Sequence, residues 1–135
     1  MQKSPKLKRK DLIYPELCYQ IMGILFEIYK ELGSSYQEKY YQKIVATELK
    51  KYGLRFKEQV KAPLIYKGNK IGNYFLDFVI ENKIVLELKK VERFSQKHIE
   101  QIYAYLKVSG LKLGILATFT KNGVRFKRIV NIRKP

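Results

Sequence analysis

The sequence predicts one domain of the α/β class, more narrowly α+β, in which helices flank a mixed β-sheet. Three segments place apolar residues at helical spacing, and others alternate as half-buried strands do. The predicted order is α-α-β-β-β-α-β-β, and the helix between two strands indicates one crossover inside a mixed sheet. We assign residues 14–135 to this domain and residues 1–13 to a basic N-terminal arm that we expect to be disordered.

The first helix is predicted over residues 15–32. Pro15 suits the first helical turn, and Gly33 is a favoured residue directly after a helix end. An apolar stripe at helical spacing should face the core, and it consists of Leu17, Ile21, Ile24, Leu25, Ile28 and Leu32.

The second helix is predicted over about residues 36–51. Its start fits a capping box, with Ser35 as the N-cap residue and Glu38 as the third helical residue. This interpretation would explain Glu38 without any functional role. Tyr41, one turn later, is more often a core aromatic than a site residue.

Strands are predicted next, and turn signals separate them. A Gly-Asn turn is expected at residues 67–70, and the turn Glu81-Asn82-Lys83 joins the next two apolar segments. On the strand before that turn, strict alternation places on one face Tyr74, Leu76, Phe78 and Ile80. The remaining strands of this region are predicted at Leu54–Lys61, Pro63–Tyr66, Ile71 onward and Ile84–Lys89.

The third helix is predicted over about residues 95–109, with Ser95 as N-cap and Gly110 past its end. Two further strands should flank the Asn-Gly turn at residues 121–123. The helix has a predicted core stripe of Ile99, Ile102, Tyr103 and Leu106. Beside it lies a polar ridge of His98, Gln101 and Tyr105.

The hairpin around residue 82 carries charges where a core should be apolar. If Ile80 pairs with Ile84, the register places Asp77 opposite Glu87 on the same face. Like charges at such positions destabilise a sheet, and burying an unpaired carboxylate costs more. A hard divalent cation bound by both carboxylates would remove the conflict.

Lys89 projects from the same face as this acidic pair. Two carboxylates and a lysine on one face suit metal-assisted hydrolysis of a phosphodiester. The alternative is that nearby lysines, such as Lys83 or Lys89, neutralise Asp77 and Glu87 without any metal.

Cysteine and histidine are too scarce to hold a metal. Cys18 is the single cysteine and His98 the single histidine, which excludes an intramolecular disulfide, a cysteine-based zinc site and a multi-histidine site. Oxygen ligands point to Mg²⁺ or Mn²⁺. We expect Cys18 to be a small core residue and His98 to be solvated or structural.

The charge balance predicts a polyanionic partner. The chain has 28 Lys and Arg against 12 Asp and Glu, for a net charge of +16. Such a field attracts nucleic acid, which we favour over a merely soluble basic surface. The basic residues are spread along the chain rather than gathered on one amphipathic helix, and no apolar run is long enough to cross a bilayer. We therefore expect no membrane association and a cytoplasmic protein.

Short motifs add a family resemblance. The spacing Asp77-x9-Glu87-x-Lys89 resembles the signature of PD-(D/E)xK nucleases, and Gln101-x-x-x-Tyr105 resembles a motif of one branch of that superfamily. Residues from about 14 to 131 resemble the small bacterial and archaeal GxxExxY proteins, which are placed among the PD-(D/E)xK nuclease-like folds. The matching segments are Ile28–Tyr41, Gly72–Ile80, Ile84–Lys89, Gln101–Leu106 and Ser109–Leu116, with Ser35 in the place of the name-giving glycine.

The resemblance implies a restriction-endonuclease-like fold and a metal-dependent nuclease, with DNA favoured over RNA as substrate. It implies that Asp77 and Glu87 bind Mg²⁺ or Mn²⁺, aided by the backbone carbonyl of Leu88. Glu38 would reach the site as an additional ligand, and this role stands level with its role in the capping box.

The resemblance also assigns roles to two other polar residues. Lys89 would orient the attacking water or offset charge on the phosphate, and Gln101 would hydrogen-bond the substrate or the site lysine. The alternatives are an ion pair between Lys89 and Glu87, and a merely polar helix edge at Gln101. Nucleic-acid contacts are expected from the basic residues around the start of the third helix, Lys90, Arg93 and Lys97, and from Tyr105 further along that helix.

Two other functions remain open. The chain could be a catalytically silent nucleic-acid-binding module of the same fold, or a basic protein that associates with RNA or the ribosome. A single small domain often dimerises to cut both strands of a duplex, so a homodimer is also open, although no segment identifies an interface.

Overall fold

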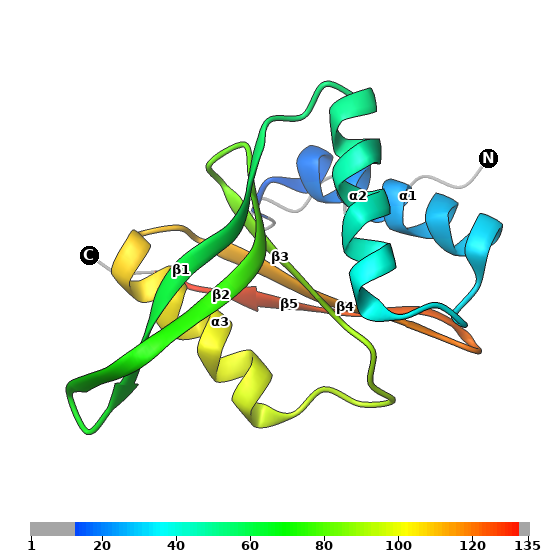
Figure 1. Ribbon diagram of the computed structural model, residues 1–135. Coiled ribbons are helices and arrows are strands. Elements are labelled where there is room, and N and C mark those ends of the chain that lie inside the picture. The colour runs from blue at the N-terminus through cyan, green and yellow to red at the C-terminus, as the bar shows by residue number, and fades with distance from the viewer. Residues whose placement is uncertain (1–12, 133–135) are drawn as a thin grey trace.

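The computed structural model describes residues 13–132, and these form a five-stranded mixed sheet with three helices (Figure 1). The predicted element order and fold class are confirmed. All but the last residue of the predicted basic N-terminal arm lies outside the described residues. The elements are α1 (Pro15–Leu32), α2 (Glu38–Lys51), β1 (Phe56–Tyr66), β2 (Asn69–Ile80), β3 (Ile84–Lys89), α3 (Gln96–Ser109), β4 (Leu113–Thr120) and β5 (Gly123–Val130).

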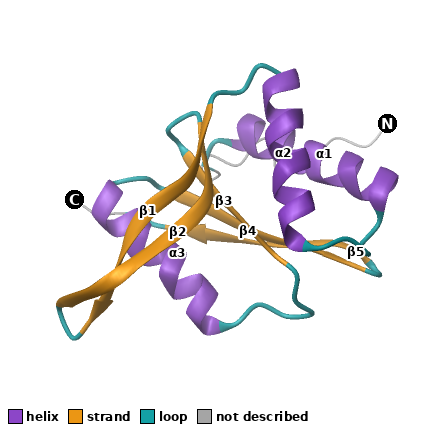
Figure 2. Cartoon of the chain, in the orientation of Figure 1, coloured by secondary structure: helices purple, strands orange, loops and turns teal. Residues whose placement is uncertain are grey.

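The strands lie in the sheet in sequence order, β1-β2-β3-β4-β5. β3 and β4 are parallel, and every other neighbouring pair is antiparallel. The parallel pair requires the crossover that α3 provides. Figure 2 shows the helices on both sides of the strands, with α1 and α2 together and α3 apart from them. No helix within residues 13–132 is long and apolar enough to cross a membrane.

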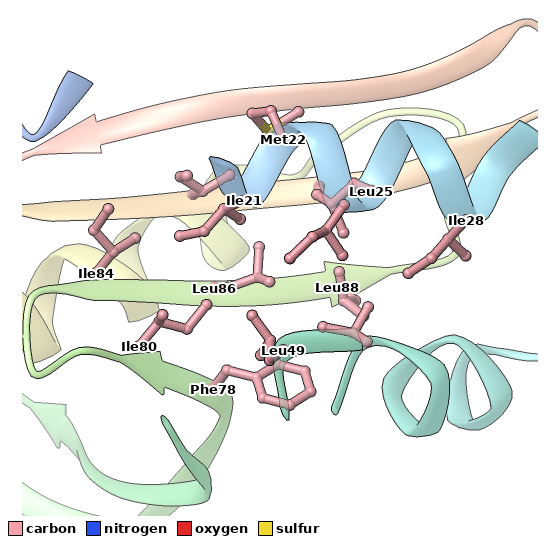
Figure 3. Packing of buried hydrophobic residues seen from close by; sticks show 14 of the residues in the cluster. Ile21, Met22, Leu25, Ile28, Leu49, Phe78, Ile80, Ile84, Leu86 and Leu88 are labelled. Carbon is pink, nitrogen blue, oxygen red and sulfur yellow. The ribbon is translucent and has the colours of Figure 1, made fainter. Parts of the chain in front are cut away.

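The larger core cluster lies between the sheet and the pair α1 and α2. The predicted stripe of α1 supplies Ile21, Leu25 and Ile28, which lie over the apolar side chains of β3 (Figure 3). Tyr41 of α2 is fully buried and stacks on Phe119, with ring centroids 4.3 Å apart. Burying such side chains contributes about 1.5–3 kcal/mol each, so this face anchors the sheet on which the site is built.

The smaller cluster lies between α3 and the opposite face of the sheet. Ile102 and Leu106 of α3 pack against Val79 and Val85. Gly114 permits this close approach, because a Cβ at that position would lie 2.5 Å from Cγ2 of Ile102. The absence of a side chain at position 114 therefore sets how closely α3 approaches β4.

The register of the β2–β3 hairpin is as predicted. Ile80 pairs with Ile84, and the amide of Lys83 donates to the carbonyl of Ile80 at 2.9 Å. Glu81 and Asn82 both have positive φ, of 54° and 53°, which closes the short turn. The turn thereby fixes which residues of β2 and β3 stand opposite one another.

Strict alternation along β2 was a wrong prediction. Phe78 and Ile80 belong to the larger cluster, whereas Leu76 and Tyr74 pack with the smaller cluster on the other face. Gln59, the β1 residue opposite Asp77, has a positive φ of 51°. The irregular backbone and the strong twist of a two-stranded ribbon change which face each side chain meets.

Two helix predictions need correction. The capping box at Ser35 is wrong, because Gln37 is the N-cap of α2 and Glu38 is its first residue, with no side-chain cap bond. In α3, Tyr103 is exposed, whereas Tyr105 packs against the smaller cluster. The N-cap at Ser95 is confirmed, and here His98 completes a capping box.

Candidate active site

The acidic pair lies where β2 and β3 separate. Their pairing ends at Phe78 and Leu86, so Asp77 and Glu87 are the next residues on each strand. Oε1 of Glu87 accepts a hydrogen bond from the amide of Asp77 at 2.8 Å, and Oδ2 of Asp77 accepts one from the amide of Leu88 at 2.8 Å. Each carboxylate therefore binds the backbone of the opposite strand, and together they replace the ladder bonds of a regular hairpin.

Both carboxylates are withdrawn from solvent. Asp77 is 5% exposed and Glu87 is 2% exposed. The hydroxyl of Tyr74 donates to Oε2 of Glu87, and Nζ of Lys89 lies 3.4 Å from the same oxygen. Nζ of Lys89 also lies 5.7 Å from the centre of the Tyr74 ring. The lysine thus stands at the mouth of the site, about one-fifth exposed, with its charge directed at the acidic pair.

Gln42 of α2 joins a third carboxylate to the pair. Its Nε2 donates to Oδ1 of Asp77 at 2.9 Å and to Oε2 of Glu38 at 3.1 Å. Glu38 is free to make this contact because it does not cap its own helix. The predicted proximity of Glu38 to the site is therefore seen, with Gln42 between the two carboxylates.

The concentration of negative charge changes the acidity of Asp77. Burial and the neighbouring charge of Glu87 raise the pKa of Asp77 to about 7, and the charge of Glu38 acts in the same direction. The hydrogen bond from Leu88 and the charge of Lys89 oppose this rise. One lysine is thus too little to offset the cost of ionising these carboxylates together.

The start of α3 borders the site. Burial and the positive charges of Lys89 and Lys97 lower the pKa of His98, while the charge of Glu38 acts against them. His98 is therefore close enough to sense the site, although its hydrogen bonds are those of a helix cap. Of the two predicted roles for His98, solvated or structural, the structure shows the structural one, because its side chain completes the capping box of α3.

Gln101 and Tyr105 do not join the acidic pair. Within residues 13–132, no hydrogen bond links Gln101 to Glu87 or Lys89, although Gln101 is half-buried one turn beyond His98. Tyr105 lies further along α3, in a hollow toward the β2–β3 turn that is lined by Val60, Val79 and Asn82 among others. Burial raises the pKa of Tyr105.

The predicted basic residues surround the β3–α3 loop. Lys90, Arg93 and Lys97 are all exposed. Lys90 is held in place, because its ammonium donates to the carbonyl of Ser34 and lies over the Tyr41 ring. The loop that leads from the acidic pair to α3 is thereby tied to the α1–α2 loop.

Sequence reasoning missed Gln42 and Tyr74. Gln42 follows Glu38 by four residues, so helical spacing offered a signal that was not used. Tyr74 offered no such signal, because alternation places it on the face opposite Asp77. Alternation fails between Leu76 and Phe78, and the hydroxyl of Tyr74 donates to Glu87.

The residues fit a hard divalent cation. In the described part of the chain, no three His, Cys, Asp or Glu side chains lie close enough together to hold a metal ion. Asp77 and Glu87 alone would suit Mg²⁺, which is commonly held by one or two carboxylates and otherwise by water and phosphate oxygens. The buried carboxylates outnumber the single nearby lysine, so a divalent cation would offset their charge.

Comparisons with known proteins show what this chain is similar to. The model of the PD-(D/E)XK nuclease superfamily matches residues 15–129. The crystal structure of SSO0001 has 21% sequence identity and a TM-score of 0.51, and the match covers 71% of this chain and 51% of that one. This chain therefore spans about half the length of that relative. An alkaline exonuclease from Laribacter hongkongensis has 12% identity and a TM-score of 0.47, with coverage of 98% and 73%.

No curated protein matches the chain. The likeness to SSO0001 bears on the fold alone, and it agrees with the mixed sheet described above. The superfamily match runs from the first residue of α1 to the last but one of β5, and it includes both members of the acidic pair. The chain belongs to the PD-(D/E)XK nuclease superfamily.

Proposed function

We propose that this protein is a metal-dependent nuclease that hydrolyses phosphodiester bonds in DNA. One observation carries the proposal: Asp77 and Glu87 are buried side by side at the point where β2 and β3 separate, with Lys89 next to them. Membership of the superfamily and the net charge of +16 support a nucleic-acid substrate.

Asp77 and Glu87 are the proposed ligands of Mg²⁺ or Mn²⁺, with the carbonyl of Leu88 as a backbone ligand. When bound, the cation would polarise the scissile phosphate and lower the pKa of an attacking water. The amide of Leu88 donates to Asp77, which supports a fixed position for both proposed ligand groups. Glu38 is a proposed additional ligand. It would bind the cation through a water, or directly after its carboxylate displaces Gln42 from Asp77.

Lys89 is proposed to offset negative charge on the phosphate or to orient the attacking water. Its ammonium is partly exposed and lies 3.4 Å from Oε2 of Glu87, so it can donate to a phosphate oxygen or a water at the mouth of the site. Gln101 is proposed to contact the substrate, because it is half-buried on the helix that borders the site. Contacts of Lys90, Arg93, Lys97 and Tyr105 with the nucleic-acid backbone or bases complete the proposal.

Tyr74 and Gln42 are proposed positioning residues. Each donates to an oxygen of the acidic pair, Tyr74 to Glu87 and Gln42 to Asp77. Such hydrogen bonds orient ligand carboxylates and tune their affinity for a metal. Neither residue needs to touch the substrate for this role.

The test is cleavage of supercoiled and linear duplex DNA with Mn²⁺, Mg²⁺ or EDTA by the purified protein and by Glu87→Gln. We expect cutting that requires the metal and is lost in the variant, while the variant still binds DNA. Glu48→Gln, in α2 and away from the acidic pair, is the matched control and should cut as the parent does. Calorimetry that found no binding of Mn²⁺ in the presence of DNA would refute the proposal.

We further propose that the chain belongs to the GxxExxY branch of the superfamily. Two of the three motif positions have defined contacts. Glu38 reaches Asp77 through Gln42, and the hydroxyl of Tyr41 donates to the carbonyl of Gly33 at 2.6 Å. A cytoplasmic location and pairing of two copies to cut both strands belong to the same proposal.

A silent binding module is the second candidate function. The observation that favours it is that all four carboxylate oxygens of Asp77 and Glu87 already accept hydrogen bonds from protein groups. Under this alternative, gel shifts would be unaffected by EDTA and no metal would support cutting. The cleavage experiment above separates the two functions.

A further inference from the structure

Beyond the acidic pair, β1 and β2 continue as a two-stranded ribbon. The pairing of β2 with β3 begins at Phe78, whereas its pairing with β1 runs on to Asn69. Residues 69–76 of β2 therefore pair only with β1 inside the described sheet. At about 3.3 Å per residue, this stretch spans about 25 Å. Figure 1 shows the ribbon passing α3 and projecting away from the other strands.

The charged residues of the ribbon are all positive. Residues 60–76 contain three lysines and neither Asp nor Glu. Lys61, Lys67 and Lys70 are all exposed, and Lys67 lies in the two-residue turn at the tip. A run of this length with one sign of charge is complementary to a phosphate backbone.

Large apolar side chains are exposed at the same tip. Tyr66 is 58% exposed and Ile71 is 66% exposed. Ile71 is the extra residue of a bulge, because the register passes from the pair Ile65–Lys70 directly to the pair Leu64–Gly72. A bulge redirects a side chain, and here it leaves an isoleucine facing solvent between lysines.

The outer edge of the ribbon is poorly suited to pairing with a second copy of this chain. Pro63 has no amide hydrogen to donate, the register shifts beside Ile65, and Gln59 has a positive φ. These features are the ones by which natural edge strands resist β-pairing. A second copy would also bring the same lysines, so like charges would meet.

We propose that this ribbon is an arm that contacts duplex DNA in its major groove, and the proposal rests on the nuclease function proposed above. The major groove is about 12 Å wide and admits a two-stranded β-ribbon. Lys67 and Lys70 contact phosphates on the groove walls, while Tyr66 and Ile71 contact base edges. Because the ribbon begins at Asp77, its tip meets the duplex about seven base pairs from the bond to be cut, at about 3.4 Å per pair.

The test measures binding of a labelled 30-base-pair duplex by fluorescence anisotropy in EDTA, over a series of salt concentrations. The double variant Lys67→Gln/Lys70→Gln should bind about tenfold more weakly at 0.1 M salt, and its slope of log K against log salt should be shallower by about 1.8. The variant Tyr66→Ser/Ile71→Ser should bind more weakly with an unchanged slope, because it removes no charge.

The matched control is Lys83→Gln/Lys112→Gln. Both lysines are exposed, and they directly precede Ile84 and Leu113, which pair at the end of the sheet opposite the acidic pair. This control loses the same charge as the lysine variant of the ribbon, and it should keep the affinity and the slope of the parent. All the replaced side chains are exposed, so circular dichroism and urea unfolding should match among the proteins.

The outcomes separate this inference from the nuclease proposal. Equal affinity and slope in the ribbon variants and the control would overturn the arm, even if the parent cuts DNA. So would a parent that does not bind the duplex, or a parent dimer that the ribbon variants dissociate without any change in DNA binding. Binding that depends on the ribbon, with no cutting under any metal, would support the arm and refute the nuclease.

Discussion

Oδ2 of Asp77 accepts a hydrogen bond from the backbone amide of Leu88 at 2.8 Å. The carboxylate of one strand therefore fixes the backbone of the next at the peptide that joins Glu87 to Leu88. Glu87 makes the reciprocal bond to the amide of Asp77. A change at either acid thus affects both strands.

The stability of the metal-free protein should fall as the pH rises from 5 to 8. The pKa of Asp77 is raised to about 7 in the folded chain, above the ordinary value of 3.8, so folding favours the protonated acid. That stabilisation is complete at low pH only and is lost as the pH rises through 7. Relative to Asp77→Asn, the parent should lose about 1–3 kcal/mol over this range in urea unfolding with EDTA.

Asparagine is a suitable reference because its side-chain oxygen can still accept the bond from Leu88. The other titratable groups are common to both proteins, so their contribution to the pH dependence cancels in the comparison. Parallel pH profiles for the parent and Asp77→Asn would show that the raised pKa is absent.

Divalent metal should stabilise the folded protein at pH 8 more than at pH 5.5. Binding requires Asp77 to lose its proton, and at pH 5.5 that acid is still protonated. At a Mn²⁺ concentration of about 100 times Kd, the expected gain at pH 8 is about 2.7 kcal/mol. Differential scanning fluorimetry with Mn²⁺ or EDTA measures it, and Glu87→Gln should show little gain at either pH.

Tyr74→Phe should weaken metal binding and cleavage by about 10–100-fold, the usual cost of removing a hydrogen bond to a ligand. The change keeps the ring under Lys89 and removes only the hydroxyl that donates to Glu87. Titration calorimetry with Mn²⁺ and cleavage rates measure the two effects. Tyr103→Phe, at an exposed tyrosine of α3, is the control and should behave as the parent. If both variants match the parent, Tyr74 has only a structural role.

Gly114→Ala should destabilise the protein by about 1–3 kcal/mol through overpacking. The new methyl group would lie 2.5 Å from Cγ2 of Ile102, so α3 would have to move away from β4. Ile102→Leu removes that branch, and the double variant should recover part of the loss in a double-mutant cycle. Additive effects in urea unfolding would contradict the proposed contact.

The sequence was sufficient to predict the element order and the relation between Asp77 and Glu87. Both depend on local rules, namely the apolar spacing of the helices and a three-residue turn that sets the register at Ile80 and Ile84. Lys89 follows from the same register. This part of the site could be predicted because a single hairpin contains it.

The remaining site residues depend on tertiary structure. Gln42 lies 35 residues from Asp77 in sequence, and only the packing of α2 brings them together. Tyr74 could not be predicted because the alternation of side chains along β2 fails between Leu76 and Phe78. At Ser35 a local capping pattern was misleading, because the helix begins at Glu38 with Gln37 as its N-cap.

The parallel pairing of β3 with β4 has a consequence for synthesis of the chain on the ribosome. Glu87 stands beside Leu116, and Lys89 stands beside Thr118, whose hydroxyl bonds to Val91 in the loop that follows. A nascent chain that ends before β4 has an exposed β3 edge, and the loop between β3 and α3 lacks its bonds to Thr118. We therefore expect the acidic pair to take up its geometry only after β4 has been made, which would keep nascent chains that lack β4 from acting on nucleic acid.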